Sequence, residues 1–243
     1  MTRVKICCVS SVEEARLAVR LGASAVGLVS EMPSGPGVIP EALIAEIAAA
    51  VPPPIGKFLL TSQTDPAEIV ARQRRCGVNT VQICDCLPSG AHETLRKSLP
   101  GISLVQVIHV ADGESVVEAL KMARKVDALL LDSGSQTLPV GELGGTGRTH
   151  DWSLSAEIVE RSGVPVFLAG GLNAANIGEA IQSVQPFGVD VCTGVRTAGA
   201  LDERKLTQFI AAVSAAAQQV AAQPTPQRGA AELDRSAGEN FDG

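Results

Sequence analysis

Short apolar runs recur along this chain with amphipathic segments between them, and this alternation constrains the fold more than any other feature. Strands covered on both faces read as nearly continuous apolar runs, and helical segments between such runs are typical of repeated βα units with a parallel sheet. Eight runs occur: Val4 to Cys8, Ala25 to Val29, Gly56 to Leu60, Thr80 to Ile83, Ser103 to His109, Asp127 to Asp132, Val164 to Ala169 and Gly188 to Thr193. Eight βα units predict an α/β fold, a single (β/α)8 TIM barrel.

An open doubly wound sheet is the alternative architecture. No Gly-x-Gly-x-x-Gly turn follows the first apolar run, which a dinucleotide-binding sheet of that kind would carry. The length of 243 residues suits one large barrel or two small domains. We predict one catalytic barrel domain over residues 1–217.

Helix boundaries are marked by residues with known capping preferences. Ser11-Val-Glu-Glu14 has the pattern of a capping box, and Asp65-Pro66 offers an N-cap followed by proline in the first turn. Glycines that suit left-handed helix C-caps follow three predicted helices, at Gly22, Gly77 and Gly163.

The last segment, residues 218–243, is polar, rich in small residues and without an apolar period. This composition predicts a disordered tail, for which a docking role is an alternative.

Composition argues against several classes of function. Aromatic residues make up 2% of the chain, tyrosine is absent and the net charge is −6, so we predict no nucleic-acid partner. The N-terminal apolar run soon becomes charged, unlike a secretory signal, and no apolar stretch reaches bilayer length. We therefore predict a cytoplasmic protein with no membrane partner.

The six cysteines lack the dense spacing of a disulfide framework and are predicted to be free thiols. Cys84-x-Cys86 raises the alternative of a zinc site. A second such pair is missing and the chain has three histidines, so we predict no metal.

Polar residues that end apolar runs are the candidates for chemistry, because the active site of such a barrel lies at the carboxyl ends of its strands. Asp132 ends the sixth run, where a dry setting would suit a general acid, although capping a neighbouring loop is an equal alternative. Cys7 ends the first run, and taken alone it would be interpreted as a small buried hydrophobe. Paired with Asp132 across a pocket mouth it is predicted to serve as a base, because an aldose-to-ketose isomerisation requires both an acid and a base. Lys5 lies on the same strand face and would favour the thiolate of Cys7.

Glycines after the seventh and eighth runs predict a phosphate cradle of backbone N–H groups. One side would be formed by Gly170, Gly171 and Leu172, and the other by Thr193, Gly194 and Val195. The segment from Gly134 to Asp151 contains Gly144-Gly-Thr-Gly147 and reads as a loop over the site. No Gly-Lys-Ser/Thr follows it, so ATP is not predicted.

These motifs, taken in order, resemble those of the phosphoribosylanthranilate isomerase family from about residue 3 to residue 216. The similar segments are VKIC at 4–7, LLLDS at 129–133, GGTGRTHDW at 144–152, FLAGGLNAANI at 167–177 and GVDVCTGV at 188–195. The resemblance implies an Amadori rearrangement of a phosphosugar amine in tryptophan biosynthesis, without cofactor or metal. It implies that Asp132 protonates the ribose ring oxygen and that Cys7 removes the C2 proton.

The chain departs from this family around the aromatic end of the substrate. Cys7-Cys8 stands where the family usually has Cys-Gly, and Ser34-Gly-Pro-Gly-Val38 lacks the arginine that binds the anthranilate carboxylate. Gln82-Ile-Cys-Asp85 replaces Gln-Leu-His-Gly, with Gln82 kept as a substrate-binding candidate, and Arg196 replaces an acid. Substitute cations for that arginine would be Lys57, Arg148 or Arg196, although a solvated surface charge is the alternative for each. That alternative is preferred for Lys57 and Arg148, so Arg196 is the favoured substitute.

Three functional interpretations remain open at this point. One is a phosphoribosylanthranilate isomerase with an altered anthranilate subsite. A second is a paralogous isomerase of another phosphosugar amine. The third is a non-catalytic barrel that binds a phosphate ligand. The oligomeric state is not readable from the sequence.

Overall fold

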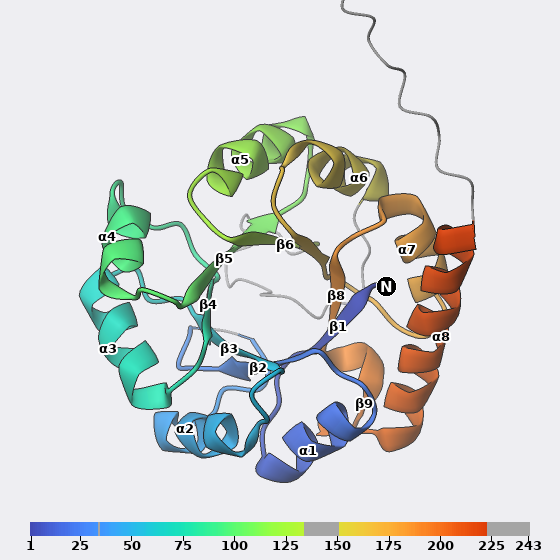
Figure 1. Ribbon diagram of the computed structural model, residues 1–243, viewed down its shortest axis with the longest axis horizontal. Helices are drawn as coiled ribbons and strands as arrows, with labels where there is room; N and C mark the ends of the chain where they lie inside the picture. The colour runs from blue at the N-terminus through green and yellow to red at the C-terminus, as the bar shows by residue number, and fades with distance from the viewer. Residues whose placement is uncertain (34, 134–150, 223–243) are drawn as a thin grey trace, which may run out of the picture.

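A computed structural model of the chain describes residues 1–33, 35–133 and 151–222, and these form the predicted closed barrel (Figure 1). The eight parallel strands follow one another around the ring, and β1 closes it by pairing with β8. The strands are β1 Arg3–Ile6, β2 Ala25–Val29, β3 Gly56–Thr61, β4 Thr80–Ile83, β5 Ser103–His109, β6 Ala128–Asp132, β7 Val166–Leu168 and β8 Gly188–Val191. All eight predicted strands are present, and three have the predicted bounds.

The helices surround the strands as an outer ring (Figure 1). They are α1 Val12–Arg20, α2 Glu41–Ala50, α3 Pro66–Cys76, α4 Ala91–Ser98, α5 Gly113–Ala123, α6 Trp152–Arg161, α7 Ile177–Val184 and α8 Glu203–Ala222. A 3-10 turn, η1 Thr193–Val195, follows β8, and a small hairpin of β9 Arg196–Thr197 and β10 Ala200–Leu201 precedes α8.

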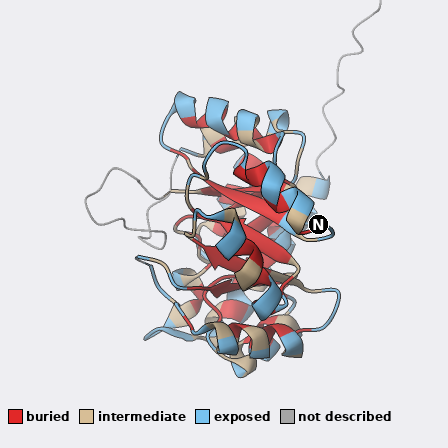
Figure 2. Ribbon diagram, turned by 90° about the vertical axis from the view of Figure 1, so that its left-hand side faces the viewer, coloured by how far each residue is buried: buried red, intermediate tan, exposed pale blue. Residues whose placement is uncertain are grey.

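Two apolar layers hold the barrel together, and buried residues concentrate on the strands (Figure 2). The larger layer lies between strands and helices and is built from Val, Ile, Leu and Ala side chains. The smaller layer fills the barrel interior, where the rings of Phe58 and Phe167 meet edge to face at a centroid distance of 5.8 Å. The barrel interior is therefore filled by side chains below its carboxyl-terminal mouth, as is typical of this fold.

The predicted helix caps are mostly present. The side chain of Asp65 accepts a hydrogen bond from Ala67 N, and Gly22, Gly77 and Gly163 all have positive φ. The capping box at Ser11 is only half formed. Ser11 accepts from Glu14 N, but Glu14 accepts from Ser10 N instead of returning a bond to Ser11.

The predicted boundary of the tail at residue 218 is wrong by five residues. Helix α8 continues to Ala222, because alanine and glutamine favour helix and α8 packs along α7. The side chains of Gln182 and Gln219 are joined by a 2.8 Å hydrogen bond across these two helices. The rest of the predicted tail, residues 223–243, lies outside the described residues. None of the described helices combines the length and the apolar character needed to cross a bilayer.

Candidate active site

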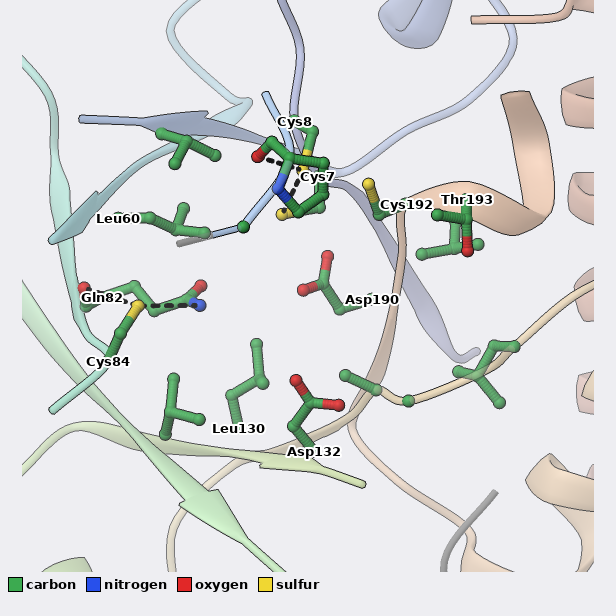
Figure 3. Close-up of a pocket in the computed structure, with 18 of the residues that line it drawn as sticks. Cys7, Cys8, Leu60, Gln82, Cys84, Leu130, Asp132, Asp190, Cys192 and Thr193 are labelled. Atoms are coloured by element: carbon green, nitrogen blue, oxygen red, sulfur yellow. Dashed lines mark hydrogen bonds between the residues drawn. The ribbon is translucent and has the colours of Figure 1, made fainter. Parts of the chain in front are cut away.

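A pocket opens at the carboxyl ends of the strands and takes lining residues from all eight of them or from the loops that follow (Figure 3). The lining residues are Cys7, Cys8, Val29, Met32, Gly35, Pro36, Leu60, Gln82, Cys84, Val107, His109, Leu130, Asp132, Ala169, Gly170, Gly171, Leu172, Asp190, Val191, Cys192 and Thr193. The fold thus places the predicted acid, the predicted base and part of the predicted phosphate cradle around one cavity.

Cys7 and Asp132 face the pocket from opposite sides in Figure 3, with the carboxyl group of Asp190 between them in this view. The strand β1 ends at Ile6, yet Cys7 is still held by the sheet, since its amide donates to Val191 O at 2.9 Å. Burial raises the pKa of Asp132, against the opposing effect of His109. A carboxyl group with a raised pKa can keep its proton to a higher pH, as a general acid requires.

Lys5 lies beneath the pocket and does not line it. Its side chain is fully buried and its Nζ donates to Asp190 Oδ2 at 2.8 Å, as the register that pairs Lys5 with Asp190 dictates. Burial lowers the pKa of Lys5, but Asp190 and the sulfur of Cys7 outweigh burial, so the net pKa is raised. Lys5 is therefore a fixed positive charge below Cys7, and its side chain is not among those that line the pocket.

The glycine loops adopt the backbone geometry that a cradle needs. Gly170 and Gly171 have φ of 86° and 63°, and a Cβ on Gly170 would overlap Ser133. A Cβ on Gly194 would overlap the carbonyl oxygen of Leu172, so the two loops touch at this point. Gly170, Gly171, Leu172 and Thr193 line the pocket, whereas Gly194 and the buried Val195 support the loop from behind.

Arg196, the substitute cation favoured by sequence, does not line the pocket. Its guanidinium forms an ion pair with Glu14 at 3.0 Å and donates to the carbonyl oxygens of Cys7 and Cys8. Burial tends to raise the pKa of Glu14, but the hydrogen bond from Arg196 and two backbone donors hold it below its usual range. Arg196 is thus bonded to the end of β1 and to Glu14, an arrangement that does not support its predicted role in substrate binding.

The other two candidate cations are not brought to the pocket by the described structure. Lys57 is the second residue of β3 and lies at the amino end of that strand, away from the mouth. Arg148 belongs to the segment 134–150, which lies outside the described residues together with Ser34. Gln82, the substrate-binding candidate, lines the pocket, and its Oε1 is buried without a hydrogen-bond partner among the described residues.

The family described as N-(5'-phosphoribosyl)anthranilate (PRA) isomerase matches residues 4–212. The chain belongs to this isomerase family.

Relatives and solved structures agree with this assignment. An N-(5'-phosphoribosyl)anthranilate isomerase 2 of Methanosarcina mazei is 37% identical over 211 residues, covering 86% of this chain and 92% of the relative. The phosphoribosyl anthranilate isomerase of Thermotoga maritima superposes with a TM-score of 0.76 at 30% identity, covering 88% of this chain and all of the other. Another such isomerase, solved with reduced 1-(o-carboxyphenylamino)-1-deoxyribulose 5-phosphate, has a TM-score of 0.73 at 28% identity, with 88% and 100% coverage.

Two departures from the PRA isomerase pattern are coupled in space. Cys8 is in the left-handed region with φ of 59°, which suits the glycine usual in the family, and its side chain packs against Gly37. A Cβ on Gly37 would lie 2.5 Å from the Cβ of Cys8. The extra side chain at residue 8 therefore fits because residue 37 has none.

Two pocket residues were missed by the sequence reasoning. Asp190 stands inside an otherwise apolar strand, a position where a charged residue signals a specific partner. His109 ends the fifth predicted strand, the same signal that identified Asp132. Among the described residues, no three His, Cys, Asp or Glu side chains are grouped closely enough to hold a metal ion, and Cys86 is exposed.

Proposed function

We propose that this chain isomerises N-(5-phosphoribosyl)anthranilate to 1-(2-carboxyphenylamino)-1-deoxyribulose 5-phosphate, an Amadori rearrangement of tryptophan biosynthesis. The observation that carries this proposal is the presence of Cys7 and Asp132 on opposite sides of one pocket, with glycine loops at its β7 and β8 edge. An acid and a base so placed are what conversion of an aldose amine into a ketose requires.

Asp132 begins the reaction by donating its proton to the ribose ring oxygen. The bond between C1 and that oxygen breaks, and the nitrogen lone pair forms the C=N bond of a protonated Schiff base. The raised pKa of Asp132 supports this role because the group retains a proton to give.

Cys7 completes the rearrangement as a thiolate that removes the proton from C2. The electrons of the C2–H bond form an enolamine, which tautomerises to the ketone by taking a proton at C1. The Lys5 ammonium lies two residues before Cys7 on β1, where it forms an ion pair with Asp190 at the base of the pocket. The reaction needs no electron donor or acceptor, because C1 is reduced as C2 is oxidised.

The phosphate group would lie against Gly170, Gly171, Leu172 and Thr193, with Gly194 and Val195 shaping the cradle behind them. Glycines at these points let backbone N–H groups approach the phosphate closely. Asp190 keeps one oxygen, Oδ1, buried without a partner among the described residues, and we assign it to a ribose hydroxyl.

The test is turnover of the purified chain with N-(5-phosphoribosyl)anthranilate, combined with complementation of a tryptophan auxotroph that lacks this isomerase. Turnover and growth with the wild-type chain, lost in both Cys7→Ser and Asp132→Asn, would support the proposal. A folded wild-type protein that fails both assays would favour a paralogue acting on another phosphosugar amine. Binding of the phosphosugar without turnover would favour a non-catalytic barrel.

A further inference from the structure

One pocket residue, His109, has no role in the reaction described above. It is the last residue of β5, and Val105 and Val107 of the same strand face the barrel interior. Side chains two residues apart share a face of a strand, so His109 points into the pocket that it lines.

Both ring nitrogens of His109 are buried and form no hydrogen bond within the described part of the chain. Buried polar atoms in folded proteins nearly always have a partner, and leaving one unpaired is costly. By contrast, the buried His92 outside the pocket pairs its Nε2 with Gln106 Oε1 at 3.0 Å. The unmet hydrogen bonds of His109 therefore point to a ligand group.

The charges around the pocket indicate which group that is. Among the described lining residues, two side chains are carboxyl groups, Asp132 and Asp190, and none is lysine or arginine. Lys5 and Arg196 are buried elsewhere in ion pairs of their own. His109 is thus the one described lining side chain that can carry a positive charge.

The position of His109 matches the direction in which the substrate must extend. Asp132 acts on the ring oxygen, which is bonded to the same carbon, C1, as the aglycone nitrogen. Asp132 ends β6, and the glycine loops proposed to bind phosphate follow β7 and β8, on one side of β6. On the other side of β6 lies β5, whose last residue, His109, is paired in register with Asp132. An aglycone that leaves C1 away from the phosphate therefore runs toward β5.

We infer that His109 binds the carboxylate of the aglycone and makes the pocket selective for an acidic aromatic amine. This inference rests on the proposed function, because the carboxylate belongs to the substrate proposed there. The charge-assisted hydrogen bond replaces the water that the carboxylate loses on entering the pocket.

The experiment compares N-(5-phosphoribosyl)anthranilate with the aniline counterpart that lacks the carboxylate. His109→Gln is expected to raise KM for the anthranilate compound about ten- to hundredfold with a smaller change in kcat, and to change KM for the aniline compound less than about twofold. His92→Gln, the same substitution at a buried histidine outside the pocket, should affect both compounds alike.

A binding measurement makes the test independent of turnover. The reduced ketose product and its counterpart made from aniline are titrated calorimetrically into the wild type, His109→Gln and Arg148→Gln. Loss of preference for the carboxylate in His109→Gln alone supports the inference. Equal weakening of both ligands, or a carboxylate-specific loss in Arg148→Gln with none in His109→Gln, overturns it. Failure of the proposed function is a separate result, namely a wild-type chain that turns over neither phosphoribosylamine.

Discussion

The two halves of the pocket differ in how far the chain itself has satisfied their polar groups. The half that we propose carries the reaction, called the reaction half, consists of Cys7, Asp132, Asp190 and the loops at Gly170–Leu172 and Thr193. The half that we propose receives the aglycone, called the aglycone half, consists of Met32, Gly35, Pro36, Leu60, Gln82, Cys84, Val107 and His109. In the reaction half, internal bonds hold Asp190 Oδ2 to Lys5 and the end of β1 to Arg196, and Asp190 Oδ1 is the one pocket-lining polar side-chain atom of this half that is buried without a partner among the described residues. In the aglycone half, Gln82 and His109 keep buried polar atoms without partners among the described residues.

This contrast teaches where the site is preorganised and where it depends on its ligand. Groups that move protons must be held in place before the substrate arrives, and the reaction half is held by side chains from distant parts of the chain. Groups that recognise a substrate can leave their hydrogen bonds open, because the ligand completes them. The departures from the family pattern at residues 8, 35, 36 and 84 line the pocket in or beside the aglycone half.

The largest expected effect would come from removing the acid of the reaction half. Asp132→Asn should lower kcat at least ~10²-fold, in line with the loss of a general acid. Cys7→Ser should lower kcat by a similar factor through loss of the base. Steady-state kinetics on N-(5-phosphoribosyl)anthranilate measures both, and near-full turnover in either variant would remove that residue from the mechanism.

The same Asp132→Asn variant should have a higher free energy of unfolding than the wild type, and this difference should grow as pH rises. Burial raises the pKa of Asp132, so the folded state disfavours the ionised carboxylate. The gain over wild type should be absent below the ordinary carboxyl pKa of about 3.9 and develop as pH rises above it. Thermal unfolding at pH 3.5 and pH 7.5 measures this, and a stability gap that is the same at both pH values would contradict the argument.

The ion pair of Arg196 with Glu14, together with the bonds of Arg196 to the Cys7 and Cys8 carbonyl oxygens, is called the Arg196 clamp. Breaking it should lower the free energy of unfolding without changing the preference for a carboxylate-bearing substrate. Arg196→Met leaves the Glu14 carboxylate, whose side chain is 13% exposed, without its cation, and we expect a loss of about 2 kcal/mol, below the cost of breaking a fully buried pair. The half-exposed Arg75, which pairs with Glu41, is the matched control, and Arg75→Met should change the free energy of unfolding by less than about 1 kcal/mol. Urea unfolding measures both variants.

The Arg196 clamp also has a pH signature. Because the pKa of Glu14 is lowered, its contribution is present above the ordinary glutamate pKa of about 4.3 and is lost as pH falls through the lower folded value. Arg196→Met should therefore lose less stability, relative to wild type, in strong acid than at pH 7. If Arg196→Met instead raised KM only for the carboxylate-bearing substrate, Arg196 would be a ligand of the aglycone carboxylate.

A smaller effect is expected at the phosphate edge of the reaction half. The Cβ of Gly194→Ala would overlap the Leu172 carbonyl and push apart the two loops, so inhibition by inorganic phosphate should weaken about tenfold, the effect of ~1.4 kcal/mol. Gly178→Ala is the control, since its Cβ meets nothing within 4 Å. Equal inhibition constants for Gly194→Ala and wild type would place the phosphate elsewhere.

The smallest expected effect lies where the two halves meet, at Cys8. Cys8→Gly and Cys8→Ala both remove the thiol, but only glycine relieves the left-handed backbone at φ of 59°. Cys8→Gly should therefore be more stable than Cys8→Ala by about 1 kcal/mol, measured by urea unfolding. Equal stabilities would show that this backbone carries no strain.

Much of the fold and of the reaction half could be predicted because the signals are local in the chain. Apolar runs bounded by caps and glycines determined the eight strands, and the strand ends identified Cys7, Asp132 and the glycine loops. The helix end near residue 218 was placed too early because the composition becomes polar before the packing of α8 against α7 ends.

The sequence by itself determined the barrel, its family and the residues at the ends of its strands, since strand periodicity and turn chemistry act over a few residues. Only the tertiary structure decided which charges are free to meet a substrate. Arg196 is 182 positions from Glu14 and Lys5 is 185 positions from Asp190, yet barrel closure brings each pair into contact. The same closure leaves His109 without a partner among the described residues. Whether a charge is paired depends on the register of strands and loops far apart in the chain, which no local pattern encodes.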